Sequence, residues 1–168
     1  MLNDMHLPSV ADTELLGAAL ARSLPRAGEF GAVLYLKGDL GAGKTTCVRA
    51  LLRTCGITRR VRSPTYTLVE TYGAVDFTYV HVDLYRLSGE PEAEGLGLRD
   101  LADARCLLMV EWPEKGGAAV PRADVELHLE YEGDGRLARL SSFTSTGERW
   151  LEKLGYDSTL GLYVSNIT

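Results

Sequence analysis

Cysteine, aromatic residues and long apolar runs are all scarce in this chain of 168 residues. Its three cysteines form neither a CxxC pair nor an even set, which argues against a disulfide framework and favours reduced thiols. No apolar run approaches the roughly 18 residues of a membrane span, and residues 1–10 lack the cationic and apolar segments of a secretory signal. We therefore expect a cytoplasmic protein that does not associate with membranes.

A general excess of basic residues is also absent. The net charge of −5 argues against a nucleic-acid binder with a broadly basic surface, and 45% apolar with 24% charged residues excludes a disordered chain. One segment departs from the acidic average, because residues 44–62 contain six basic residues and no acidic one. This segment is expected to meet RNA phosphates or an acidic partner, or else to form an ordinary solvated helix face.

Apolar spacing and turn residues predict alternating helices and strands along the chain. Helices are predicted at residues 9–24, 45–55, 98–102 and 146–154. Strands are predicted at residues 31–36, 67–72, 78–84, 106–110, 124–131 and 136–143. We expect one domain over residues 1–155, followed by a loosely packed tail over residues 156–168.

A glycine-rich segment joins the strand at 31–36 to the helix at 45–55. Residues 38–45, GDLGAGKT, match the phosphate-binding pattern G-x-x-x-x-G-K-S/T, and they lie in the strand–loop–helix context that the pattern requires. The backbone N–H groups of Gly41, Ala42 and Gly43 are expected to surround phosphate oxygens at the positive end of the helix. The fold class predicted is therefore α/β, a three-layer P-loop NTPase-like fold with a mixed parallel and antiparallel central sheet.

The side chains that follow the glycines suit a nucleotide with a metal ion. Lys44 is expected to reach the β- and γ-phosphates, Thr45 to bind Mg²⁺, and Thr46 to touch the α-phosphate. No N/T-K-x-D element for guanine is present, which favours ATP over GTP. ATP and Mg²⁺ are thus the predicted cofactors.

Two carboxylates follow predicted strands, as a metal-dependent phosphate site requires. Glu111 ends the apolar run at 106–110 and is expected to hold the metal or position water. Asp83 ends the strand at 78–84 and is a second candidate for a catalytic or metal-linked role. His81 shares a strand face with Asp83 and is expected to be a packed or capping side chain.

Three further features near these carboxylates have an open role. Residues 63–67, with the hydroxyls of Ser63, Thr65, Tyr66 and Thr67, are either a loop that senses the γ-phosphate or an ordinary loop before a strand. Arg86 is a candidate for stabilising the transition state, although no complete arginine finger is evident. Trp112 is either a core residue or an aromatic platform beside the nucleotide.

Five segments together resemble the bacterial TsaE (YjeE) family of P-loop ATPases, in the family's order and over about residues 7–154. They are GDLGAGKTT (38–46), SPTYTLV (63–69), HVDLYRL (81–87), GLGLRD (95–100) and EWPE (111–114). The resemblance implies that Thr45 and Glu111 hold Mg²⁺, that Asp83 assists hydrolysis, and that residues 63–67 act as a switch-like loop. Cys47 departs from the aromatic or aliphatic residue common in the family.

The resemblance also implies a role and partners. The family is required for tRNA threonylcarbamoyladenosine formation beside the anticodon, with the transferase TsaD and its companion TsaB, and contact with tRNA is expected through that complex. ATP hydrolysis is expected to drive or reset the cycle of TsaD and TsaB, with slow turnover when they are absent. Two alternatives stay open: a nucleotide-gated binding module with incidental hydrolysis, and a small-molecule P-loop kinase.

Overall fold

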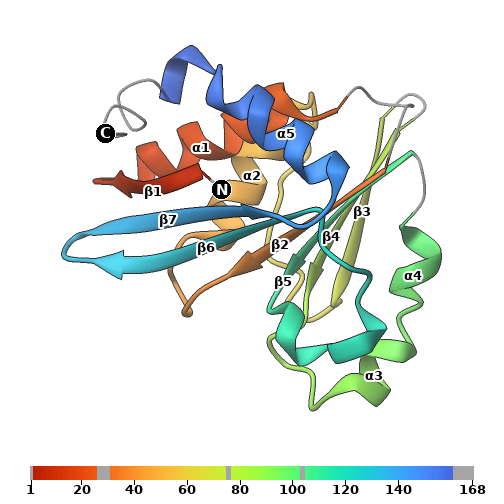
Figure 1. Ribbon diagram of the computed structural model, residues 1–168. Coiled ribbons are helices and arrows are strands. Elements are labelled where there is room, and N and C mark those ends of the chain that lie inside the picture. The colour runs from red at the N-terminus through yellow and green to blue at the C-terminus, as the bar shows by residue number, and fades with distance from the viewer. Residues whose placement is uncertain (1, 26–30, 75–76, 103–104, 161–168) are drawn as a thin grey trace.

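A seven-stranded sheet forms the middle layer of the computed structural model, which describes residues 2–25, 31–74, 77–102 and 105–160. Its strands are β1 (Leu2–Leu7), β2 (Ala32–Lys37), β3 (Val69–Ala74), β4 (Phe77–Asp83), β5 (Cys106–Glu111), β6 (Val125–Glu132) and β7 (Gly135–Ser142). They lie in the order β1-β7-β6-β2-β5-β4-β3 (Figure 1). The central strands β6, β2, β5 and β4 pair in parallel, and β1, β7 and β3 pair antiparallel toward the edges. The sheet is therefore mixed, as predicted.

Helices cover both faces of the sheet (Figure 1). The larger ones, on one face, are α1 (Val10–Ser23), α2 (Lys44–Thr54) and α5 (Ser145–Gly155). On the other side lie the short helices α3 (Glu90–Glu94) and α4 (Leu98–Leu101), with the 3-10 turns η1 (Pro113–Lys115) and η2 (Gly117–Ala119). No helix in these described ranges is long and apolar enough to cross a bilayer. The three layers confirm the predicted α/β class.

Strand β5 shows how the sequence creates two cores. Every residue of this strand is buried, and alternate side chains point to opposite faces of the sheet. Leu107 and Met109 belong to the core beneath α1, α2 and α5, whereas Leu108 and Val110 belong to the core on the other face. A continuous apolar run therefore marks a strand that is covered on both sides.

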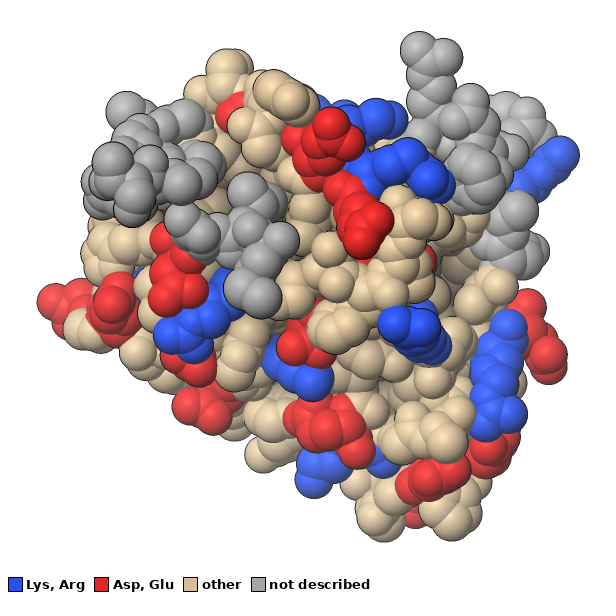
Figure 2. Space-filling model, viewed as in Figure 1, with Lys and Arg blue, Asp and Glu red and all other residues tan. Residues whose placement is uncertain are grey.

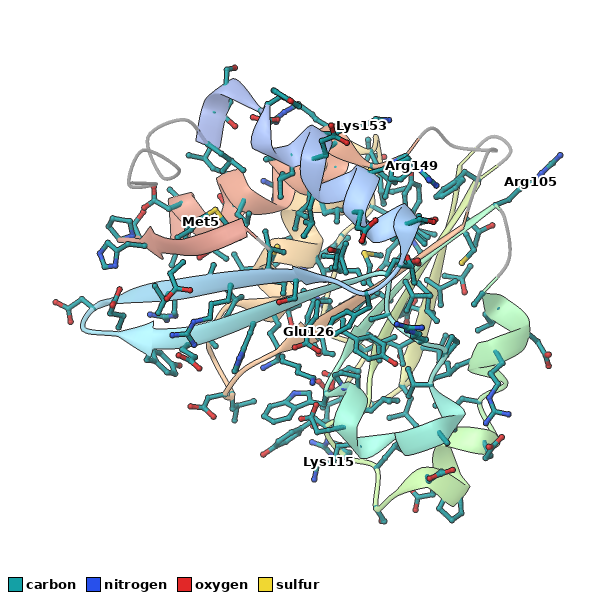
Figure 3. All side chains as sticks on the ribbon, viewed as in Figure 1. Met5, Arg105, Lys115, Glu126, Arg149 and Lys153 are labelled. Carbon is teal, nitrogen blue, oxygen red and sulfur yellow. The ribbon has the colours of Figure 1, made fainter. Side chains whose placement is uncertain are left out.

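The predicted elements agree with the structure, with two omissions. The sequence did not predict β1 or α3, because both are rich in polar residues and β1 is held by pairing with β7 from far along the chain. Met5 of β1 is buried where the strand pairs with β7 (Figure 3). Strand β3 begins two residues later than predicted, since Leu68 has a φ of 64°, which is incompatible with an extended strand.

The segment expected to form a loose tail begins with ordered contacts. Arg22 on α1 donates to Asp157 at 2.8 Å, and Leu160 in the 3-10 turn η3 (Ser158–Leu160) is buried in the core under α1. Residues 161–168 lie outside the described residues, as do residues 75–76.

Candidate functional site

The glycine-rich loop connects the carboxyl end of β2 to the first turn of α2. Gly43, the residue before the helix, has a φ of 112°, and Gly38 has a φ of 125°. A Cβ atom on Gly38 would collide with the backbone carbonyl of Leu129 on β6, so this position needs glycine for space as well as for its conformation. The first turn of α2 carries no acidic residue, which leaves the positive end of the helix dipole available to an anion.

Lys44 is folded back over the same loop. Its Nζ donates to the carbonyl oxygens of Gly38 at 2.5 Å and Asp39 at 2.8 Å, and the side chain is only 4% exposed. The Nζ also lies 4.2 Å from the ring centroid of Trp112. Burial lowers the pKa of Lys44, while the charge of Glu111 opposes that shift. The ammonium group is thus held at the loop beside a carboxylate.

Glu111 ends β5, and one oxygen atom of its carboxylate contacts both α2 and β4. Its Oε1 accepts a hydrogen bond from Thr45 Oγ1 at 2.8 Å and lies 2.8 Å from Nε2 of His81. An ionised carboxylate only accepts, so Nε2 of His81 is the donor in this contact. His81 is fully buried, and its Nδ1 has no hydrogen-bond partner among the described residues. Glu111 is therefore the only polar contact of the His81 ring among the described residues.

Asp83 is the second buried carboxylate and lies opposite Glu111 in the β4–β5 register. Its Oδ2 accepts from Thr65 Oγ1 at 2.9 Å and from the hydroxyl of Ser63, and its Oδ1 accepts from the backbone N–H of Tyr85 at 3.0 Å. These bonds tie the loop at 63–67 to the end of β4.

One pocket of about 390 Å³ collects the residues that the sequence assigned to catalysis and to the metal. Lys44, Thr45, Asp83 and Glu111 all line it. They meet because β2, β4 and β5 run parallel and end at the same edge of the sheet, where ligands bind in open α/β folds.

The pocket includes most of the other candidates as well. Gly41, Gly43, Thr46, Ser63, Thr65, Arg86 and Trp112 line it, whereas Ala42, Tyr66 and Thr67 do not. Ala42 is a buried residue of the glycine-rich loop, and Tyr66 is 83% exposed. Thr67 bonds to Glu70 at 3.3 Å instead. The hydroxyl-rich loop at 63–67 is therefore divided between the pocket and the surface.

The segment that carries the glycine-rich loop and both carboxylates falls within the match to a known family. A family model described as "Threonylcarbamoyl adenosine biosynthesis protein TsaE" matches residues 7–139. The chain belongs to the TsaE family.

Curated relatives agree with this assignment, and a solved structure shares the fold. A protein from Haemophilus influenzae named tRNA threonylcarbamoyladenosine biosynthesis protein TsaE is 42% identical over 69% of this chain and 73% of its own. A protein of the same name from Bacillus subtilis is 37% identical over 71% and 73%. The crystal structure of Bacillus subtilis YdiB has the same fold, with a TM-score of 0.72 at 24% identity over 91% of this chain and 93% of that one.

Aromatic side chains shape the outer wall of the pocket in this TsaE-family chain. Trp112 has a left-handed φ of 58° and packs against Tyr85 with ring centroids 5.0 Å apart. Its ring lies beside Lys44 at the pocket, and it is also partly buried against the core on the α3–α4 face, so its role beside a nucleotide stays a prediction. Arg86 lies over the ring of Tyr66, 4.2 Å from its centroid.

The β6–β7 hairpin braces the glycine-rich loop from the opposite side, a contact that the sequence did not predict. Tyr131 Oη donates to the Leu40 carbonyl at 3.0 Å, and Arg136 Nε donates to the Ala42 carbonyl at 3.0 Å. A smaller cavity of about 90 Å³ lies here, lined by Thr46 and Arg136 among others. No sequence pattern marks these two side chains, because they are more than 80 residues away from the loop.

The donors in the main pocket suit a hard cation. Within the described ranges no three His, Cys, Asp or Glu side chains cluster as a closed metal site. The available oxygen ligands are the Thr45 hydroxyl and the carboxylates of Glu111 and Asp83. Oxygen donors of this kind suit Mg²⁺, which usually takes one or two protein ligands together with phosphates and water.

Proposed function

We propose that this TsaE-family protein binds and hydrolyses ATP with Mg²⁺, and that it acts in the formation of threonylcarbamoyladenosine in tRNA. The observation that carries the proposal is the contact of 2.8 Å between Thr45 and Glu111 inside the pocket that Lys44 also lines. A phosphate loop, a lysine, a hydroxyl and a strand-end carboxylate together form the machinery of phosphoryl transfer.

Each side chain has a distinct part in this reaction. The loop backbone and Lys44 hold the phosphates and offset the charge that develops on the transferred group. Thr45 and Glu111 would hold Mg²⁺, which supplies further charge neutralisation. Asp83 orients the attacking water, and its bonds to Ser63 and Thr65 couple that water position to the loop at 63–67.

The partners proposed are TsaD and TsaB, with tRNA engaged in their complex. Arg86 lies over Tyr66 and bonds to no carboxylate among the described residues, so a partner that reorders residues 63–67 would also redirect this arginine. We expect slow hydrolysis by the isolated protein and faster hydrolysis with the partners. The three free cysteines support a cytoplasmic location, where thiols stay reduced.

A second function, nucleotide-gated binding, is favoured by the bonds that Ser63 and Thr65 donate to Asp83. Because Asp83 holds Ser63 and Thr65, nucleotide in the pocket would set the shape of an exposed loop even without hydrolysis. In this case ATP binding without hydrolysis would be enough for the loop at 63–67 to dock to a partner.

Glu111→Ala separates the two functions. ATP binding, ATP hydrolysis and partner-dependent tRNA modification are measured in this variant, with Glu152→Ala on the exposed face of α5 as the control. Hydrolysis and modification that are lost together support the ATPase. Modification that survives without hydrolysis supports gating, and labelled γ-phosphate on an acceptor other than water would support a kinase instead.

A further inference from the structure

A further concave surface lies outside the nucleotide pocket, formed by α2 and the segment 57–62 that follows it. We call it the arginine groove, and it has a volume of about 610 Å³. Five arginines line it: Arg49, Arg53, Arg59, Arg60 and Arg62. No acidic residue occurs between positions 40 and 69, so the groove collects positive charge in a chain whose net charge is −5.

Two of the five arginines are engaged by the protein itself. Arg59 donates to the Thr71 carbonyl, stacks on Tyr72 with 4.1 Å between Cζ and the ring centroid, and lies 3.8 Å from Glu70. Arg49 donates to the Val61 carbonyl at 3.3 Å. These contacts fix the walls of the groove.

The other three arginines have no partner in the described protein. Arg53, Arg60 and Arg62 are exposed, and none makes a hydrogen bond or an ion pair there. Elsewhere charge is mixed: on the face shown in Figure 2, acidic and basic side chains are interspersed. An unneutralised cluster of like charges opposes folding and favours binding of a polyanion.

Phosphate groups suit this cluster better than isolated carboxylates do. The cluster contains arginine and no lysine, and the planar guanidinium group can bind phosphate through two parallel hydrogen bonds. A neighbouring depression of about 290 Å³ shares Arg59, Arg60 and Arg62 and is also lined by Tyr66, an aromatic side chain that is 83% exposed. One acidic residue, Glu70, lines it as well, 3.8 Å from Arg59. A phosphate-binding groove that continues to an exposed ring is typical of surfaces for single-stranded nucleic acid.

We propose that the arginine groove binds the phosphodiester backbone of RNA, and that Tyr66 stacks on an unpaired base. The choice of RNA rests on the proposed function in tRNA modification, and the charge and the aromatic ring support it independently. Since Tyr66 belongs to the loop tied to Asp83, bound RNA would touch the segment that borders the nucleotide pocket. RNA would then contact this protein directly, in addition to its contact through the partners.

The test is anisotropy of a fluorescent tRNA transcript titrated with the full chain between 50 and 200 mM salt, without nucleotide. Arg60→Ala/Arg62→Ala is compared with Arg149→Ala/Lys153→Ala, which removes the same charge from α5 (Figure 3). The groove variant is expected to bind about tenfold more weakly, with a salt slope smaller by about 2, whereas the α5 variant keeps the wild-type slope. Tyr66→Ala is expected to weaken binding by about 5- to 150-fold.

Several results would overturn the proposal. They are no binding of RNA at 50 mM salt, equal losses in the two double variants, or binding of an acidic peptide in place of RNA. All four arginine and lysine positions are exposed, so circular dichroism is expected to show wild-type folding. Lys44→Ala keeps the two proposals apart: loss of ATP binding with RNA binding intact supports the groove as a separate site, and failure of ATP binding in the wild type refutes only the ATPase.

Discussion

Replacing His81 by leucine removes one hydrogen bond from the buried carboxylate of Glu111 and leaves the bond from Thr45. Losing one partner of a buried charged group costs about 1–3 kcal/mol. The cost is expected near the lower end, because leucine also removes the unpartnered Nδ1 atom from the core. For a chain of this size each kcal/mol lowers the melting temperature by about 2–4 °C, so a fall of about 2–6 °C is predicted.

The functional effect should exceed the loss of stability. Groups that orient a metal ligand typically change metal affinity by about 10- to 100-fold, and His81 contacts the predicted ligand directly. Thermal unfolding and Mn²⁺ titration by electron paramagnetic resonance, with ATP present, measure the two effects. His81→Gln, which can keep a donor, should recover part of the affinity.

His128 provides the matched control. It is half-buried on β6 and lies 3.7 Å from Glu130, away from the pocket residues. His128→Leu should change stability by less than about 0.5 kcal/mol and leave metal affinity unchanged. Wild-type melting and wild-type metal affinity in His81→Leu would refute the positioning of Glu111 by this ring.

Three other predictions concern the framework around the site. Burial raises the pKa of the Cys47 thiol to about 12, so a disulfide reagent at pH 8 should leave it unmodified until urea unfolds the protein, and rapid labelling of the native protein would contradict this. The bond from Arg22 lowers the pKa of Asp157 from 3.8 to about 2, so its stabilisation is present above pH 4 and lost as the pH falls toward 2. Asp157→Asn should therefore cost at most about 1 kcal/mol at pH 7 and much less at pH 2, as measured by urea unfolding, because the pair is partly exposed. Gly17→Ala on α1 should destabilise the protein by about 1–3 kcal/mol in the same assay, since its Cβ would collide with the Cys47 carbonyl, and unchanged stability would contradict that packing.

The sequence predicts those parts of the site that depend on local spacing. The strand–loop–helix context located the glycine-rich loop at the pocket, and an acidic residue after an apolar run located Glu111. Parallel strands then bring such ends together, which explains why Asp83 also reaches the pocket. Local patterns were sufficient wherever the backbone alone decides the position.

The remaining features depend on contacts between distant side chains. The bond of His81 to Glu111 requires the β4–β5 register and a particular ring orientation, and neither is encoded by a two-residue period. The contacts of Tyr131 and Arg136 with the phosphate loop depend on a hairpin from the other side of the sheet. Strand β1 was missed because its pairing partner, β7, comes near the end of the chain.

Calorimetric titration of ATP, with and without Mg²⁺, tests the central claim most directly. The wild type should bind ATP more tightly when Mg²⁺ is present, because Thr45 and Glu111 lie together at the phosphate loop. Glu111→Gln should bind ATP but lose most of that Mg²⁺ enhancement. An enhancement of equal size in the two proteins, or no binding by the wild type at millimolar ATP, would contradict the account.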